Sequence, residues 1–273
     1  MSATRGFDWR HTPGLLPLTI AIMAFLYAPL LILVIYAFNA NRLVTVWTGV
    51  SLDWFVHVAG NDDIRKAALN SVIIAFAAAI ASTAIATAGA IALQRGRLGL
   101  LGGVAGGMIV LPLIVPEIVV AITTLIFFSA IGMKNGLLNL IIAHTVFCIP
   151  FALIPIRARL SELGTSLEEA GRDLYASEAQ LFRRILLPLL MPAIASGLIL
   201  SFVVSLDDFI ISMMVSGAGS TTLPVYVYGM MRLGVTPEVN AISTILLAVS
   251  VVFVAAALLV GRRLQRTDFS QQE

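Results

Sequence analysis

The chain has 273 residues, of which 59% are apolar and 12% are charged, and its formal net charge is +2. Soluble domains are about 45–50% apolar and about 25% charged, so the composition argues against a water-soluble enzyme domain and excludes a disordered chain. So small a net charge does not suggest a nucleic-acid surface, and no nucleic-acid partner is expected. One cysteine, Cys148, and three histidines without ligand spacing predict no metal site.

Six apolar segments follow one another along the chain, and each reaches or approaches the roughly 20 residues that a spanning helix needs. Backbone groups in lipid must be hydrogen-bonded within their own segment, so we predict that all six are helices. The predicted spans are residues 15–38, 68–93, 103–131, 137–156, 186–212 and 239–261. The sequence therefore predicts an all-α integral membrane protein, with six transmembrane helices in a single transmembrane domain over residues 1–273.

Basic residues are shared unevenly between the two sets of segment flanks. The richer set holds 12 residues: Arg5, Arg10, Arg95, Arg97, Arg157, Arg159, Arg172, Arg183, Arg184, Arg262, Arg263 and Arg266. The other set holds five: Arg42, Arg65, Lys66, Lys134 and Arg232. Loops rich in Lys and Arg stay in the cytoplasm, so we expect both termini to be cytoplasmic, which agrees with an even number of spans.

Glu117 lies inside the third predicted span, directly after Pro116 and five residues after Pro112. Each proline removes a backbone donor and crowds the preceding turn, so we expect the helix to kink or unwind here. A carboxylate at this depth costs roughly 2.5–3.5 kcal/mol on insertion scales. Intramembrane acids of this kind are by default part of a functional pathway.

Asp207 and Asp208 lie towards the outer end of the fifth predicted span. No Lys or Arg lies well inside any span, so these acids and Glu117 need water, protons, another subunit or a cation. The sequence predicts an acidic path for an organic cation, to which the aromatic side chains Phe202, Phe209, Tyr226 and Tyr228 add cation–π contacts. The structural alternatives are that an Asp caps a helix and that the aromatics anchor the chain at the interface. Neighbouring helical positions differ by about 100°, so at most one of the two aspartates faces a pore.

His144, in the fourth predicted span, either relays protons or hydrogen-bonds across helices. The first role suggests an alternative function, a stand-alone proton-coupled transporter of organic cations that uses Glu117, Asp207 and His144 as its relay. A membrane-embedded enzyme is a third reading, but no nucleophile motif or metal spacing links its serines, histidines and acids.

The one long loop on the basic side spans residues 157–185, and its stretch 162–185 is predicted to form two short amphipathic helices. Two capping boxes mark their starts, Ser166 with Glu169 and Ser177 with Gln180. An apolar stripe of Leu163, Leu167, Ala170 and Leu174 lies on the first helix, and Leu181, Phe182 and Ile185 share a face of the second. Such a stripe lies on lipid or docks into the groove of a partner.

This loop resembles the EAA loop of permease subunits in binding-protein-dependent ABC importers. The family pattern is Glu-Ala-Ala, three residues, Gly, nine residues and Ile-x-Leu-Pro. This chain has Glu169-Ala170-Gly171, then Tyr175, then Ile185-Leu186-Leu187-Pro188 at the same spacing. Tyr175 stands where the family has a glycine, and glycine at a helix end commonly takes the left-handed conformation. We therefore expect a strained or reshaped turn at Tyr175.

Further motifs resemble the polyamine importers within this family. They are Leu26-Tyr27-Ala28-Pro29, Asn70-Ser71, Leu111–Glu117, Ser205-Leu206-Asp207-Asp208-Phe209, Thr221-Thr222-Leu223-Pro224 and Gly234–Ala241. The stretch Leu43-Val44-Thr45-Val46-Trp47 is most similar to putrescine permeases, with spermidine permeases as the near alternative.

The resemblance implies a type I ABC importer permease fold in the bacterial inner membrane, and a permease that is not itself an enzyme. It implies a heterodimer with a sister permease, two ATPase subunits that hold ATP and Mg, and a periplasmic polyamine-binding protein. The chain itself carries no phosphate-binding loop, and no cofactor is expected on it. The implied substrate pathway is Glu117, Asp207, Asp208, Phe209, Phe202 and Tyr226. The implied ATPase-coupling residues, within the cytoplasmic loop 162–185, are Glu169, Ala170, Gly171, Tyr175, Leu181, Phe182, Ile185 and Pro188.

Overall fold

The computed structural model describes residues 15–42, 46–96, 99–234 and 236–269, with side chains up to residue 255. Regular structure in these ranges is helical, apart from one isolated bridge between Asn39 and Val50. Five described helices are long and apolar enough to cross a membrane, and a sixth span is formed if a bent helix pair counts as one. The fold of the described residues is therefore all-α with five or six candidate spans, in agreement with the predicted fold class.

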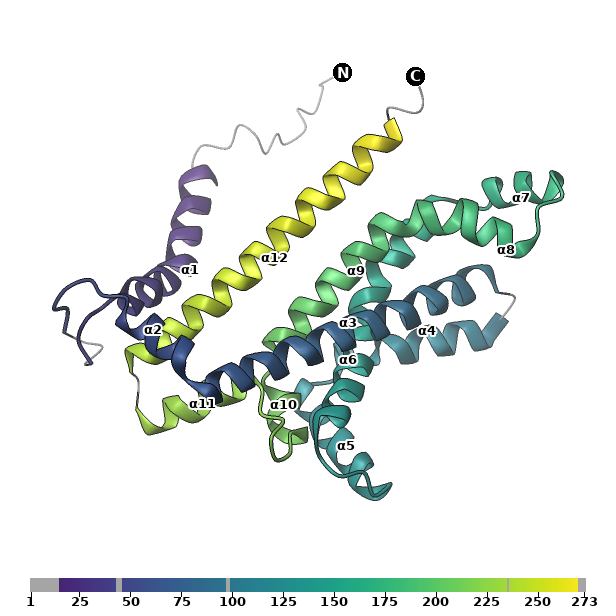
Figure 1. The fold of residues 1–273 in the computed structure, drawn as a ribbon. Helices are drawn as coiled ribbons and strands as arrows, with labels where there is room; N and C mark the ends of the chain where they lie inside the picture. The colour runs from purple at the N-terminus through teal and green to yellow at the C-terminus, as the bar shows by residue number, and fades with distance from the viewer. Residues whose placement is uncertain (1–14, 43–45, 97–98, 235, 270–273) are drawn as a thin grey trace, which may run out of the picture.

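The long helices are α1 (Leu15–Ala37), α3 (Asp62–Arg95), α6 (Leu137–Glu162), α9 (Leu187–Asp207) and α12 (Pro237–Phe269), and the bent pair is α4 (Gly99–Ile114) and α5 (Glu117–Ala130). The short helices are α2 (Asp53–Gly60), α7 (Ser166–Asp173), α8 (Glu178–Leu181), α10 (Ile210–Val215) and α11 (Leu223–Leu233), with a π-helical turn, η2 (Phe182–Leu186), between α8 and α9. The long and the short helices also lie in different parts of the molecule. The long helices form the bundle, and α7 and α8 lie at its opposite end from α2 and α11 (Figure 1).

Helices α3, α6 and α9 pack together at the centre of the bundle. Small side chains on α3 allow this approach, because Ala75, Ala78, Ala79 and Ser82 have no exposed surface. On the other side of α6, a Cβ added at Gly197 of α9 would lie 3.0 Å from the carbonyl oxygen of Ala152. The centre of the fold is thus built from side chains small enough for helix backbones to meet.

The third predicted span breaks where the two prolines led us to expect a break. Helix α4 ends at Ile114, α5 begins at Glu117, and the two axes are bent by 111°. Pro116 lacks the N–H that would continue the ladder, and it stands as the N-cap of α5 with an extended ψ of 131°. The break places Glu117 in the first turn of α5.

The fifth predicted span is shorter than expected. We predicted a helix to residue 212, but α9 ends at Asp207 and the chain is extended at Asp208, with a ψ of 122°. A new helix, α10, starts at Ile210. Hydropathy missed this break because the apolar run continues across it, whereas the break depends on how the Asp208 side chain is bonded.

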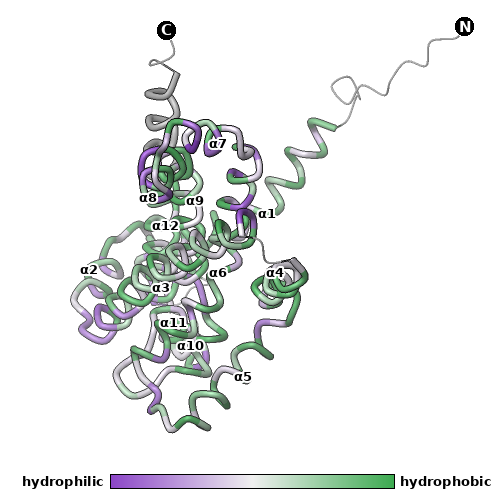
Figure 2. The backbone as a smooth tube through the Cα atoms, turned by 90° about the vertical axis from the view of Figure 1, so that its right-hand side faces the viewer, coloured by the Kyte–Doolittle hydropathy of each residue, from purple (hydrophilic) through white to green (hydrophobic). Residues whose placement is uncertain are grey.

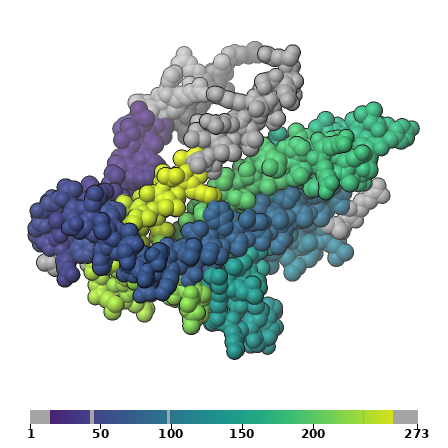
Figure 3. All heavy atoms as spheres, in the orientation of Figure 1, coloured from purple at the N-terminus to yellow at the C-terminus, as the bar shows by residue number. Residues whose placement is uncertain are grey.

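The outer surface of the bundle is apolar, as Figure 2 shows along α1, α4 and α5. Helix α1 packs against α12, and Ala37 is the one residue of α1 that is buried. Helix α5 lies at the edge of the molecule (Figure 3), where it packs against α10 on one side and exposes side chains such as Ile126 and Phe127 on the other. Surfaces of this kind face lipid or another subunit.

Candidate functional site

The two helix breaks meet inside the bundle. Helix α5, which starts at Glu117, packs against α10, which follows the break at Asp208. The carboxyl groups of Glu117 and Asp208 are consequently close enough to interact with each other. Two acids 91 positions apart in the sequence are thus brought together by the prolines before one and the extended backbone at the other.

His144 of α6 holds the second break in place. Its ring is 1% exposed, with Nδ1 2.7 Å from Ser205 Oγ and Nε2 3.1 Å from Ser212 Oγ. The same Nε2 lies 3.4 Å from Asp208 Oδ1. His144 thus bridges α6 to α9 and α10, which is the cross-helix role among the two considered from the sequence.

Asp208 has one satisfied and one unsatisfied oxygen. Oδ1 accepts a hydrogen bond of 2.9 Å from the backbone N–H of Ser212 and so caps the start of α10. Oδ2 is buried and has no hydrogen-bond partner by geometry within the described part of the chain. A buried oxygen that carries charge and lacks a donor is costly, so Asp208 combines the predicted capping role with an open acceptor.

Asp207 and Asp208 differ in exposure, and Asp208 lies outside the helix in which the sequence placed both. Asp208 is 6% exposed, whereas Asp207, the last residue of α9, is exposed. Asp207 is also close enough to Glu117 to interact electrostatically. Among the described residues no Lys or Arg forms an ion pair with Glu117, Asp207 or Asp208. We call these three residues the acid cluster.

Phe202 does not belong with the acid cluster, contrary to the prediction. It is 3% exposed and packs its ring between Phe76 and Phe253, with centroids 4.7 and 4.1 Å away. This aromatic group joins α3, α9 and α12, so Phe202 fills the core. Phe202 lies five residues before Asp207 on α9, and at about 100° a residue this offset turns its ring to another face of the helix.

Phe209 does lie beside the acid cluster, and its ring is 4.7 Å from that of Tyr228 on α11. The guanidinium of Arg232 already occupies a face of Tyr228, 4.8 Å from the ring centroid. Tyr226 lies on the other side of α11, with α2, α3 and α12. Burial, with Asp63 and Glu238 nearby, raises the pKa of the Tyr226 hydroxyl. The aromatic residue next to the acids is therefore Phe209, which contacts Tyr228, and Tyr226 is not part of this group.

The loop between α6 and α9 is fastened to the bundle by a buried ion pair. Arg95, the last residue of α3, donates to Glu168 of α7 at 2.8 Å, and both side chains are less than one fifth exposed. Arg95 also bonds the carbonyl oxygens of Leu160 and Gly164. The predicted capping box of Ser166 and Glu169 is wrong, because Thr165 is the N-cap of α7. The acid at the third helical position is Glu168, and it pairs with Arg95. No local pattern in the sequence predicts this pair, because its two residues are 73 positions apart.

The second capping box is confirmed at the start of α8, where Ser177 and Gln180 bond each other's backbone reciprocally. Helices α7 and α8 pack closely because Gly171 has no side chain, and a Cβ there would collide with Leu181 and lie 3.1 Å from Ile185. Leu181 is 3% exposed, whereas Glu169, Ala170 and Phe182 face outward. Pro188 stands in the first turn of α9, where a missing N–H costs nothing.

The apolar stripe of α7 has little cover within this chain. Leu167 is 49% exposed and Leu174 is 83% exposed. Tyr175, which follows, is 98% exposed. The end of α7 therefore presents two large apolar side chains and an aromatic ring to whatever lies beyond the bundle.

Tyr175 adopts the left-handed conformation that the family glycine would take, with a φ of 60°. It is the one non-glycine residue with positive φ among those described. Its N–H donates to Arg172 O at 2.9 Å, and the N–H of Ala176 donates to Gly171 O at 3.1 Å. These two bonds make a Schellman motif that closes α7, so the turn keeps the shape that a glycine favours and holds a tyrosine under strain.

Replacing Tyr175 with glycine is expected to stabilise this turn by about 0.5–1 kcal/mol, because relief of the left-handed strain exceeds the entropy that glycine loses on folding. The ring makes almost no contact within the chain, so little packing is lost. Hydrogen exchange at residues 175 and 176 should slow by about two- to fivefold. The neighbouring variant Leu174→Gly, at an ordinary φ of −86°, should instead speed exchange. Faster exchange in Tyr175→Gly would contradict the strain argument.

Known proteins match nearly the whole chain. It is 39% identical over 242 residues to the spermidine/putrescine transport system permease protein PotC of Haemophilus influenzae, covering 89% of this chain and 94% of that protein. It is 42% identical over 251 residues to the putrescine transport system permease protein PotI of Escherichia coli, covering 89% of each.

Solved structures share the fold. A bacterial ABC transporter involved in the import of the acidic polysaccharide alginate matches with a TM-score of 0.73 and 19% identity, over 91% of this chain and 93% of that one. The inward-facing MetNI methionine ABC transporter matches with a TM-score of 0.63 and 19% identity, over 75% and 99%. The described bundle thus has the type I importer permease fold.

The profile of one family, described as binding-protein-dependent transport system inner membrane component, matches residues 85–266. This range contains the acid cluster and the loop between α6 and α9. The chain therefore belongs to the family of binding-protein-dependent transport system inner membrane components, and it is a transport component rather than an enzyme.

Proposed function

We propose that this chain is a permease subunit of an ATP-driven ABC importer that carries polyamines from the periplasm to the cytoplasm, putrescine first and spermidine second. The observation that carries the proposal is the acid cluster. Glu117, Asp207 and Asp208 gather around two helix breaks, and no Lys or Arg of the described residues pairs with them. A group of acids in lipid without a basic partner suits a cationic substrate.

The relatives support a polyamine as that cation. Their names assign spermidine and putrescine to PotC and putrescine to PotI, and identity to each is near two fifths. A linear diamine or triamine can move its ammonium groups along successive carboxylates. Phe209 stands beside the acid cluster and can contact a passing ammonium through its ring face. Weak contacts of this kind fit a pathway, because transport requires release.

The partners follow from the surfaces that the chain leaves uncovered. A homologous sister permease would cover the apolar side of α5 and complete the pathway across from Asp207. Two ATPase subunits, which hold the ATP and Mg, would receive the exposed end of α7, where Glu169, Ala170, Leu174 and Tyr175 face outward. A periplasmic polyamine-binding protein would deliver the substrate at the opposite end. The count of basic residues supports this orientation, with α7 and both termini in the cytoplasm.

The test is uptake of labelled putrescine into proteoliposomes that contain the chain together with its sister permease, ATPase and binding protein. Uptake should require ATP inside and the binding protein outside, and unlabelled spermidine should compete. Uptake by the chain alone that collapses with the proton gradient would overturn the proposal in favour of the stand-alone proton-coupled transporter. Failure of the chain to co-purify with an ATPase and a second permease would count against it in the same way.

A further inference from the structure

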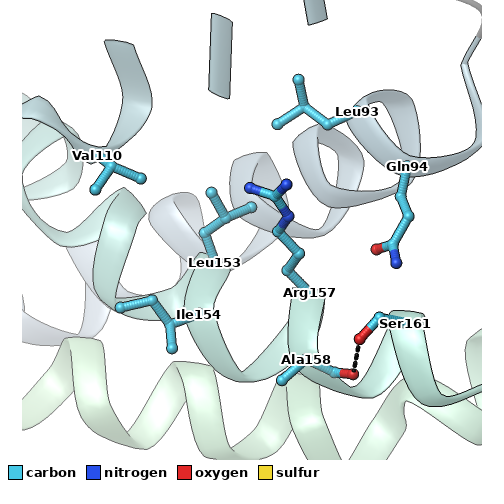
Figure 4. A pocket seen from close by; sticks show the side chains of 8 residues that line it. All are labelled: Leu93, Gln94, Val110, Leu153, Ile154, Arg157, Ala158 and Ser161. Atoms are coloured by element: carbon cyan, nitrogen blue, oxygen red, sulfur yellow. Dashed lines mark hydrogen bonds between the residues drawn. The ribbon is translucent and has the colours of Figure 1, made fainter. Parts of the chain in front are cut away.

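A pocket with a volume of about 570 Å³ opens between the last turn of α3, the second half of α4 and the last turns of α6. Figure 4 shows its two kinds of wall. Leu93, Val110, Leu153 and Ile154 make one part apolar. Gln94, Arg157 and Ser161 make the other part polar. This division is the pattern expected of a site for an amphiphile.

Arg157 is the charged group of the pocket. Its side chain rises from α6 toward α4 (Figure 4), and its Nη1 atom would lie 3.9 Å from a Cβ placed on Gly106. It forms no hydrogen bond or ion pair with the described residues. Arg159, two positions on, instead bonds Leu189 O and Glu162 within the chain. A guanidinium has five N–H donors, and since none of them is hydrogen-bonded within the described residues, all are available to an anion.

The polar wall also offers acceptors. Gln94 Oε1 is buried and has no hydrogen-bond partner among the described residues. Ser161 donates its hydroxyl hydrogen to Ala158 O at 2.7 Å, which leaves the lone pairs of Oγ open. A ligand that satisfies the whole wall therefore carries an anionic group for Arg157 and hydroxyl donors for Gln94 and Ser161.

The polar residues stand at the depth of lipid headgroups. Gln94 directly follows the predicted span 68–93, and Arg157 directly follows the span 137–156. The apolar wall residues Leu93, Leu153 and Val110 lie within the predicted spans. A ligand in this pocket thus has its charge at the membrane surface and its apolar part inside the hydrocarbon.

We infer that this pocket binds one anionic phospholipid with a hydroxylated headgroup, chemically a phosphatidylglycerol. The phosphate accepts from the guanidinium of Arg157, the glycerol hydroxyls donate to Gln94 Oε1 and Ser161 Oγ, and an acyl chain lies on Leu93, Val110, Leu153 and Ile154. A polyamine does not fit, because Arg157 repels it. A soluble phosphate ester matches the polar wall and leaves the apolar wall exposed to water.

The experiment is native mass spectrometry of the complete transporter, released from nanodiscs of equal parts phosphatidylglycerol and phosphatidylcholine. The chain should retain phosphatidylglycerol in preference, and Arg157→Gln should lower its retention about tenfold, since the variant loses a charge-assisted bond. Val110→Phe is a second test, which remains usable if Arg157→Gln does not fold. It keeps the charge of Arg157, fills the space along the apolar wall, and should also lower lipid retention. Arg184→Gln, an exposed arginine of η2 outside the pocket, should retain lipid as the unaltered chain does.

Three outcomes would overturn the inference. Equal retention of phosphatidylglycerol in Arg157→Gln and Arg184→Gln would remove the role of Arg157. Displacement of the lipid by soluble glycerol phosphate at comparable concentration would reassign the site to a free phosphate ester. Retention by the isolated chain that vanishes in the complete transporter would show that a neighbouring subunit covers the pocket.

Discussion

Replacing Asp208 with asparagine is expected to lower ATP-driven polyamine uptake by about ten- to a hundredfold, the loss that follows from removing one charged partner of an ammonium. Asparagine has the same shape and keeps an Oδ1 acceptor for the Ser212 N–H, so the cap of α10 stays. The variant therefore removes the charge while leaving the break in place. Alanine would remove both and would not separate the two roles.

The measurement is initial uptake of putrescine in proteoliposomes of the complete transporter, with the ATPase rate recorded in parallel. Asp62→Asn is the matched control, because Asp62 is an exposed acid in a surface pair with Arg65 and should transport normally. The double change Asp207→Asn with Asp208→Asn should lower uptake further than either alone. Unimpaired uptake in that double variant would sink the claim that the acid cluster lies on the pathway.

Sequence reasoning succeeded where local chemistry decides the structure. Pro112 and Pro116 predicted the break before Glu117, because each proline removes a backbone donor and crowds the preceding turn. The same is true of Ser177 with Gln180, whose capping box joins residues three apart. The strained turn expected at Tyr175 came from the resemblance to the family loop, which has a glycine there, and the φ of 60° agrees with it.

Predictions from the sequence were wrong where contacts between distant side chains decide the structure. The chain leaves the helix at Asp208 because Asp208 caps α10 and meets His144, and neither contact shows in an apolar run. Phe202 and Phe209 looked equivalent from the sequence, but packing with Phe76 and Phe253 took Phe202 into the core. The unpaired oxygen of Asp208 could be found only once these contacts were known.

Arg95 is the other residue whose role only the fold shows, and Arg95→Met is expected to loosen α7 by about 3 kcal/mol. That is the low end of the cost of leaving one partner of a buried ion pair without the other. The Glu168 side chain is 11% exposed, so its carboxylate would lose its close cation without gaining water and would keep only the half-exposed Arg172, at 4.0 Å. A movement of α7 caused by the ATPases would then no longer be transmitted to α3. Uptake should therefore fall while ATP hydrolysis continues.

Hydrogen exchange along α7 measures the loosening directly and should speed by about a hundredfold at the Glu169 and Leu174 amides. The rescue is Arg95→Met with Glu168→Met, since an apolar pair of similar volume can replace a buried ion pair. Reversing the charges is a poorer rescue, because it places an acid at the C-terminus of α3 and a base at the N-terminus of α7. Arg65→Gln, whose pair with Asp62 is exposed, should change exchange and uptake little. If Arg95→Met and Arg65→Gln behave alike, or if the double methionine variant is no better than the single one, then the ion pair does not join α7 to the bundle.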